Sequence, residues 1–196
     1  MRNQGEGSDD GGRVATRRSD GTTRTERGDG DGWHLARDAR ERMVADLEFS
    51  LEHAIQAFYR WKSECLAAVA DRRLSGDDTA ILNIIRMKDE PKRLSEIARL
   101  LNRTDTANIQ YAIRKLVKLR LIESEGGRSR KLTRYRVTSR GRELTDAYAD
   151  MRASLLMPMI GSMDMGAEDF ERVSHFLDLM ASLYSQCTQK AAARGY

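Results

Sequence analysis

The chain has 196 residues, 40% of them hydrophobic, and a net charge of +4 at neutral pH. This length allows one domain of ordinary size with tails, and the hydrophobic content is sufficient for a core. There is no apolar run of about 18 residues, which a membrane helix requires, and no apolar segment of a signal peptide at the N-terminus. We therefore expect a cytoplasmic protein without a membrane partner.

The N-terminal segment is rich in glycine and polar residues. Residues 1–32 contain eight of the fifteen glycines, together with six Arg and seven acidic residues. Such a segment buries too little apolar surface to offset the entropy lost on ordering. We predict a disordered tail over residues 1–38. A solvated tail is favoured over a basic arm that grips DNA, because its charges nearly balance.

A long amphipathic helix is predicted over residues 39–71, because apolar residues recur there at steps of three and four. Those residues are Met43, Leu47, Leu51, Ile55, Phe58, Trp61, Cys65 and Val69. About thirty helical residues span about 45 Å, more than a small core can cover, so part of this helix should meet another chain. Ser75 or Asp77 is a plausible cap for a next helix over residues 78–87.

Residues 94–141 predict a helix-turn-helix followed by a hairpin. A first helix covers residues 94–101, a turn 102–104, and a second helix 105–119, with Asp105 expected to cap its first turn. Pro91 favours an extended approach, so residues 92–93 form a short strand. Residues 121–127 and 132–138 are the hairpin strands. We expect seven apolar residues to pack in the core: Ile97, Leu100, Leu101, Ile109, Ile113, Leu116 and Val117.

Two further helices complete the chain. One opens at Thr138 and ends near Pro158, and the last covers residues 167–188 after a break over 161–166. Cys65 and Cys187 lie in different predicted helices, and we interpret both as buried small hydrophobic residues rather than as a disulfide pair. The predicted fold class is mainly α with a small β-hairpin wing, in which a winged helix-turn-helix core is flanked by long helices.

Positive charge is concentrated in one part of the chain. Residues 114–142 contain eleven Lys or Arg residues but only two acidic ones, Glu123 and Glu125, so this segment carries +9 while the whole chain carries +4. A compact domain with its charge gathered on one helix and one hairpin is typical of a protein that binds a polyanion.

The arrangement resembles the MarR family of winged-helix transcription regulators. Four segments carry the resemblance: residues 94–101, 108–116, 121–123 and 137–144. It implies a domain over residues 39–190, with a DNA-binding core at 76–142 and dimerisation helices at 39–73 and 143–190. The family also implies a homodimer and a small-molecule effector bound between the dimerisation helices and the winged domain. One departure is that Gly126 and Gly127 precede Arg128, where the family usually has an acidic residue.

The residue types of the second helix suit base recognition. Asn and Gln pair with adenine, Arg pairs with guanine, and Thr contacts the thymine methyl group. The candidates for contact with base edges are Thr104, Thr106, Ala107, Asn108, Gln110, Tyr111 and Arg114. Lys115, Lys118, Arg134 and Arg136 would contact phosphates, and Arg128, Arg130 and Lys131 at the wing tip would reach the backbone or the minor groove.

The sequence therefore predicts a dimeric, sequence-specific regulator that binds a pseudo-palindromic double-stranded DNA site. Two alternatives stay open: a winged-helix module that docks protein or RNA, and a non-specific architectural DNA binder. No nucleotide-binding, hydrolase or metalloprotease motif is present, so we expect neither an enzyme nor a metal or other cofactor.

Overall fold

The computed structural model describes residues 33–70, 74–126 and 132–195. The predicted tail lies almost wholly outside these residues, as do Arg128, Arg130 and Lys131 of the wing tip. Contacts divide the chain into two compact units, residues 1–47 and 48–196. Among the described residues, no helix is both long and apolar enough to cross a membrane.

In the first unit, the described residues form a turn and the start of the long helix α1 (Ala39–Val69). The turn closes where the Ala36 amide donates to the Trp33 carbonyl at 3.0 Å. Asp38 then accepts a hydrogen bond from the Glu41 amide at 2.8 Å, which satisfies an unpaired donor of the first helical turn. The predicted long helix is confirmed, and it ends two residues earlier than expected.

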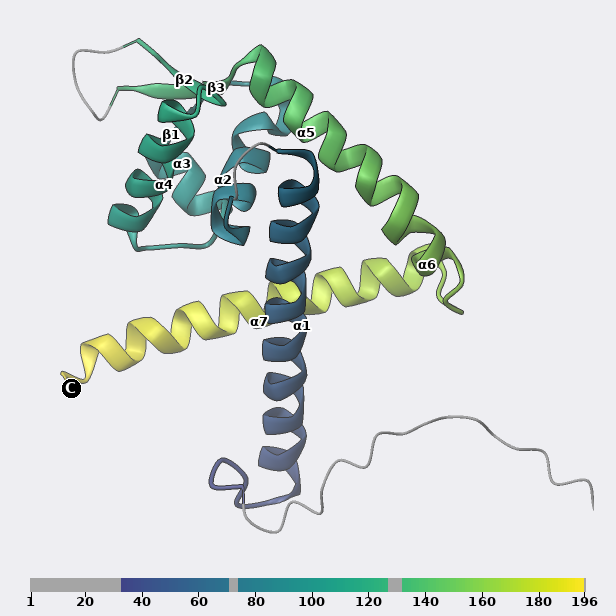
Figure 1. The fold of residues 1–196 in the computed structure, drawn as a ribbon. Coiled ribbons are helices and arrows are strands. Elements are labelled where there is room, and N and C mark those ends of the chain that lie inside the picture. The colour runs from purple at the N-terminus through teal and green to yellow at the C-terminus, as the bar shows by residue number, and fades with distance from the viewer. Residues whose placement is uncertain (1–32, 71–73, 127–131, 196) are drawn as a thin grey trace, which may run out of the picture. The chain divides into compact units, whose positions relative to one another are not determined.

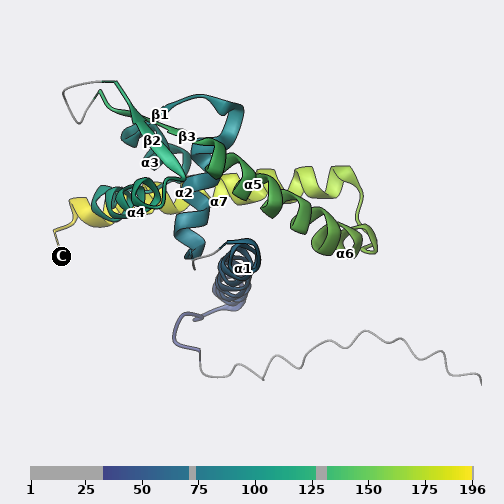
Figure 2. The ribbon, with the colours of Figure 1, turned by 45° about the horizontal axis from the view of Figure 1, so that its top comes forward.

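The second unit contains the remaining elements, in the predicted order. They are α2 (Gly76–Arg86), η1 (Met87–Asp89), β1 (Lys92–Arg93), α3 (Leu94–Leu100), α4 (Thr106–Lys118), β2 (Ile122–Glu125), β3 (Arg134–Val137), α5 (Ser139–Met151), η2 (Arg152–Leu156), α6 (Met157–Gly161) and α7 (Ala167–Ala193). The strands form an antiparallel sheet in the order β1-β3-β2, and the hairpin β2–β3 projects from the helices beside it (Figure 1, Figure 2). The predicted fold class is confirmed.

Helix α2 begins with a reciprocal cap. The Ser75 hydroxyl accepts from the Asp78 amide at 3.1 Å, and the Asp78 carboxylate accepts from the Ser75 amide at 2.9 Å. This capping box satisfies two donors that a helix start leaves unpaired. Ser75 is therefore the cap, and the helix starts two residues earlier than predicted. A Cβ on Gly76 would lie 2.6 Å from the Tyr59 ring, so glycine permits the close approach of α1 and α2.

The core of the second unit lies among α1, α2, α3, α4, α5 and the sheet. Its fully buried large side chains are Leu66, Leu74, Ile81, Leu82, Ile85, Ile97, Ile109, Leu116 and Ile122. The prediction that Val117 packs in the core is wrong, since its side chain is 39% exposed. One residue advances a helix by about 100°, so Val117 points away from the core into which Leu116 packs.

The start of α5 is packed against the end of α4. The Thr138 hydroxyl accepts from the Gly141 amide at 3.1 Å and donates to the Arg120 carbonyl at 2.7 Å. A Cβ on Gly141 would lie only 2.0 Å from the Leu121 carbonyl oxygen. Glycine at this position therefore lets α5 start directly against the chain that enters β2.

The helix predicted to end near Pro158 continues three residues further, to Gly161. After α5, the π-helical turn η2 leads into α6, in which Pro158 occupies the first turn. Proline lacks an amide hydrogen, and a first turn does not require that donor, so the helical path continues to Gly161. The predicted break then separates α6 from α7, which extends five residues beyond the predicted end.

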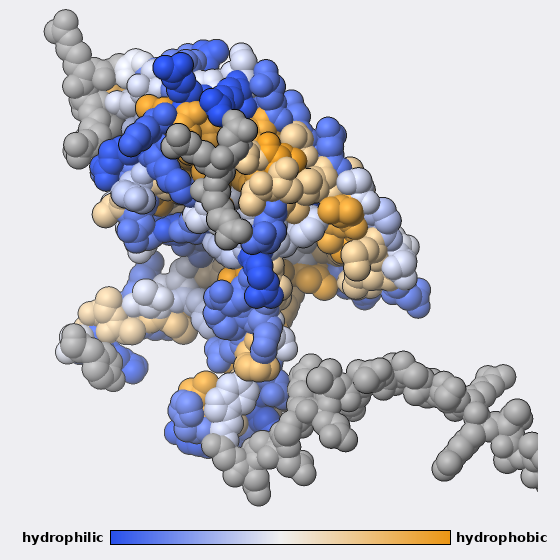
Figure 3. Space-filling model, in the orientation of Figure 1, coloured by the Kyte–Doolittle hydropathy of each residue, from blue (hydrophilic) through white to orange (hydrophobic). Residues whose placement is uncertain are grey.

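Helix α7 has no buried residue. The exposed apolar side chains along it are Phe170, Val173, Phe176, Leu177, Leu179 and Leu183. Hydrophobic residues also lie at the surface where α5 continues through η2 into α6 (Figure 3), and Leu155, Met157 and Met159 are exposed there. Cys65 is buried as predicted, but the prediction that Cys187 is buried is wrong, since Cys187 is exposed on α7.

Candidate nucleic-acid interface

The second helix of the motif, α4, follows a tight turn. Asn102 has a φ of 51°, a left-handed conformation that asparagine tolerates better than most residues. The next amide, that of Arg103, donates to the Ala98 carbonyl at 2.9 Å, which closes the end of α3. The helix then buries Ile109 and Ile113 and turns its opposite face outward.

Most of the predicted base-reading residues lie on the exposed side of this turn and helix. Thr104, Thr106, Asn108, Tyr111 and Arg114 are exposed, whereas Gln110 is half-buried. Tyr111 is 67% exposed, so its ring is accessible on the outer side of the helix. Successive positions at 100° place Tyr111, Arg114 and Lys118 near the middle of the outer face, and Asn108 at its edge.

Lys115 is one of two predicted phosphate-binding residues that the structure pairs with an acidic residue, and Arg136 is the other. The Lys115 ammonium group is paired with the Asp78 carboxylate, whose side chain is only 5% exposed. Asp78 also belongs to the cap of α2, so the pair ties the middle of α4 to the start of α2. The structure therefore engages Lys115 internally, whereas Arg114 and Lys118 make no ion pair within the described residues.

Asp105 occupies the N-cap position of α4, but the prediction that its side chain caps the helix is wrong. Its carboxylate instead pairs with Arg103, whose Nε donates at 2.8 Å, and accepts from Asn108 Nδ2 at 3.1 Å. The hydrogen bond from Arg103 is the main reason that the pKa of Asp105 lies well below its ordinary value. The carboxylate consequently stays ionised through neutral and mildly acidic pH.

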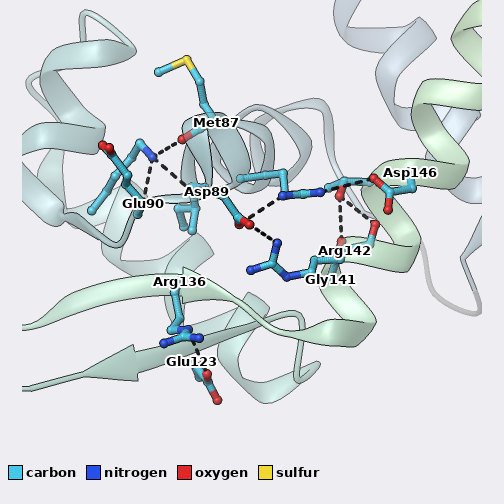
Figure 4. Close-up of polar contacts among 12 residues, drawn as sticks. Met87, Asp89, Glu90, Glu123, Arg136, Gly141, Arg142 and Asp146 are labelled. Carbon is cyan, nitrogen blue, oxygen red and sulfur yellow. Dashed lines mark hydrogen bonds and ion pairs between the residues drawn. The ribbon is translucent and has the colours of Figure 1, made fainter.

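The hairpin strands carry their own charge pairs. Arg136 on β3 lies between Glu123 at 3.4 Å and Glu125, both on β2 (Figure 4 shows the Glu123 contact). Both acidic residues of the basic segment are therefore paired with Arg136. Arg134 on the same strand is exposed, and no ion pair to it occurs among the described residues.

A second set of polar contacts connects the end of α2 and η1 with α5. Asp89 accepts from Arg142 at the start of α5 and lies 3.1 Å from Arg86, which also approaches Asp146 at 3.6 Å (Figure 4). The hydrogen bond from Arg142 is the largest cause of a lowered pKa at Asp89. These pairs join the end of α2 to α5.

Buried Lys92 reinforces the same junction from β1. Its ammonium group donates to the Glu90 carbonyl at 2.9 Å, and also to the carbonyls of Met87 and Ile85. Carbonyl groups at the end of a helix carry partial negative charge, so they stabilise a buried cation without a carboxylate. The hairpin is thereby anchored to the helices that position α4.

Comparison with known proteins agrees with this geometry. The sequence of residues 74–141 matches the family model of the winged helix DNA-binding domain. This segment has the winged helix fold. It includes α2, α3, α4 and the whole hairpin, and it ends at Gly141. No curated protein matches the chain in sequence.

Several solved structures share the fold of the winged helix domain and its flanking helices. AbfR of Staphylococcus epidermidis is 12% identical, with a TM-score of 0.60 over 76% of this chain and 95% of its own. MarR of Staphylococcus aureus, solved with salicylate and kanamycin, is 15% identical with a TM-score of 0.56 over 76% and 97%. The transcriptional regulator MosR of Mycobacterium tuberculosis, solved with DNA, is 14% identical with a TM-score of 0.56 over 71% and 96%. The predicted resemblance to the MarR family is confirmed at the level of the fold.

Sequence reasoning did not identify Asp77, Asp78 and Arg103 as parts of this interface. Asp78 pairs with a residue 37 positions away, and Asp77 with one 26 positions away. No local spacing reveals such pairs. The only sequence signal was the capping pattern that begins at Ser75, and it identifies the start of a helix without indicating what that helix holds.

Proposed function

We propose that this protein is a dimeric, sequence-specific DNA-binding transcription regulator. In this proposal α4 enters the major groove, and the hairpin contacts the backbone or the minor groove. The observation that carries it is the outer face of α4, where Tyr111, Arg114 and Lys118 are exposed on a helix whose other side is fixed to the core. The match to a winged helix DNA-binding domain and the structure of MosR with DNA support the same role.

Dimerisation is proposed from the exposed apolar side chains of α1 and α7. Phe58 on α1 is 53% exposed, and Leu183 on α7 is 52% exposed. Surfaces of this kind are commonly covered by a partner, and a two-fold dimer would present two copies of α4. The expected DNA site is then pseudo-palindromic, with half-sites about one helical turn apart.

A small-molecule effector that binds next to the winged helix domain is also proposed. The Staphylococcus aureus MarR of similar fold was solved with salicylate and kanamycin. In this chain a cavity of about 210 Å³ lies where the end of α1, the end of α4 and the start of α5 meet, with Leu74, Leu121 and Leu144 among its lining residues. An occupant there would contact both a flanking helix and the winged helix domain.

Selection of bound sequences from a random duplex pool tests the proposal. A regulator of this kind should enrich one motif with two inverted half-sites. Recovery without enrichment would instead indicate a non-specific architectural binder, and absence of duplex binding would favour a protein- or RNA-docking module. MosR is named as a transcriptional regulator, which supports a binding role over a catalytic one.

Two substitutions on α4 should have different effects on the selected duplex. Asn108→Ala is expected to relax base preference at one position, because an amide can pair with a base edge. Lys118→Ala is expected to weaken binding to every duplex and to lower the slope of log affinity against log salt by about one. Fluorescence anisotropy titrations at several salt concentrations measure both quantities.

Arg40→Ala is a matched control for charge, since Arg40 is exposed near the start of α1. It should leave both the base preference and the salt slope unchanged. If Asn108→Ala and Lys118→Ala produced the same uniform loss, the division into a base reader and a phosphate contact would be wrong.

A further inference from the structure

A continuous set of polar contacts leads from α2 to Asn108 on α4. Arg103 Nη1 donates to Asp77 at 2.8 Å, and Arg103 Nε donates to Asp105 at 2.8 Å. Asp105 in turn accepts from Asn108 Nδ2 at 3.1 Å. The ring of Tyr59 on α1 packs at the start of α2, and the Asp77 carboxylate contributes, after burial, to raising the pKa of the Tyr59 hydroxyl.

The Arg103 guanidinium is fully engaged within the protein. It forms a two-pronged pair with Asp105 and a further bond to Asp77, and its side chain is only 20% exposed. Such planar, two-pronged pairs fix geometry as well as charge. Because one cation lies between two carboxylates, the group carries a net negative charge, which is unsuited to holding a phosphate.

The contact at Asn108 has a direct consequence for base recognition. An ionised carboxylate only accepts hydrogen bonds, so Asp105 orients the Asn108 amide with its nitrogen inward. One hydrogen of Nδ2 is then used by Asp105, while the second hydrogen and the carbonyl oxygen remain available. Those two groups are the ones that an asparagine uses to pair with the edge of an adenine.

We propose that Arg103 is a positioning residue for sequence recognition: by holding Asp105 it fixes the amide orientation of Asn108, and Asp77 anchors this arrangement to α2. The inference rests on the proposed function, since it concerns how that function achieves specificity. Arg103 itself contacts no base or phosphate in this scheme.

The test compares affinities for the selected duplex and for a scrambled duplex. Arg103→Gln removes the two-pronged pair, and it should reduce the ratio of the two affinities by about tenfold while changing the affinity for the scrambled duplex less than about twofold. Asp77→Asn alters the net charge in the opposite direction and should reduce the ratio in the same direction. The two substitutions change the net charge in opposite directions. A fall in the affinity ratio for both would therefore indicate a positioning role and not simple electrostatic attraction.

A double variant identifies the residue through which Arg103 acts. Arg103→Gln combined with Asn108→Ala should discriminate no worse than Asn108→Ala alone, because both changes remove one shared interaction. A residue that only supports the fold would add its loss to that of Asn108→Ala. Arg99→Gln on the exposed side of α3 is the matched control and should leave the ratio unchanged.

Thermal unfolding followed by circular dichroism establishes that each variant is folded. If Arg103→Gln is unfolded, Arg103→Lys and Asp77→Asn carry the test, and both should still lower the ratio. An unchanged ratio, additive losses in the double variant, or a reduced salt slope for Arg103→Gln would overturn the proposal. If the wild-type protein itself shows no preference for the selected duplex, the proposed function fails first, and the positioning role fails with it.

Discussion

Replacing Gly141 with alanine is expected to destabilise the winged helix domain by about 3 kcal/mol, at the upper end of what overpacking costs. The new Cβ would lie 2.0 Å from the Leu121 carbonyl oxygen and 2.6 Å from Val137 Cγ2. The Leu121 carbonyl accepts from the Thr138 amide at 3.1 Å, so it is held in place by the same turn that would have to move. Urea denaturation followed by circular dichroism measures the loss.

Gly161→Ala is the matched control. A Cβ at Gly161, the last residue of α6, would meet no atom within 4 Å. Alanine is favoured over glycine in a helix, so this variant should be neutral or slightly more stable. If Gly141→Ala were as stable as Gly161→Ala, the close contact between α5 and the chain entering β2 would not exist in solution.

The second large effect is expected on α7. Glu in place of both Phe176 and Leu183 should convert the proposed dimer to a monomer, because two charges would be buried in an apolar contact without partners. These side chains are 42% and 52% exposed in the single chain, so the substitution should leave the fold of one chain intact. Sedimentation velocity measures the mass of the particle.

DNA affinity should fall together with the mass. A monomer reads one half-site, so affinity for the two-half-site duplex should fall by about 100-fold or more. Ser182→Glu, on the opposite side of α7, introduces a negative charge at an exposed position and should remain dimeric. A double variant that stayed dimeric would show that α7 is not part of the interface.

Local chemistry explains what the sequence could predict. Ser75 begins α2 because its hydroxyl and the Asp78 carboxylate exchange hydrogen bonds within four residues, a pattern readable in the chain. The helix-turn-helix and the hairpin follow from periodicity in the same way, and the match over residues 74–141 agrees with them.

The predictions failed where the end of a helix or the burial of a side chain depends on structure outside the local segment. Pro158 was expected to end a helix, but a widened π-helical turn before it allows the path to continue. Cys187 was expected to be buried, but it is exposed, as is much of the apolar face of α7. Whether a helix face is buried depends on what packs against it. The spacing of apolar residues along the helix does not give that information.

The candidate interface likewise contains features that the sequence predicts and features that it does not. Exposure of Asn108, Tyr111 and Arg114 on α4 follows from helical spacing around the buried isoleucines. Helical spacing does not predict the ion pair of Lys115, because its partner Asp78 lies on a different helix. Charge counting gave Lys115 the same role as Lys118, although the structure engages only the first of them internally.

The proposal that α4 reads DNA sequence is tested most directly by the affinity of the wild-type protein for the selected duplex, compared with its affinity for a scrambled duplex of equal length. At physiological salt the selected duplex should bind about 1000-fold more tightly or better, and both affinities should fall as salt rises. Equal affinities for the two duplexes would contradict the account.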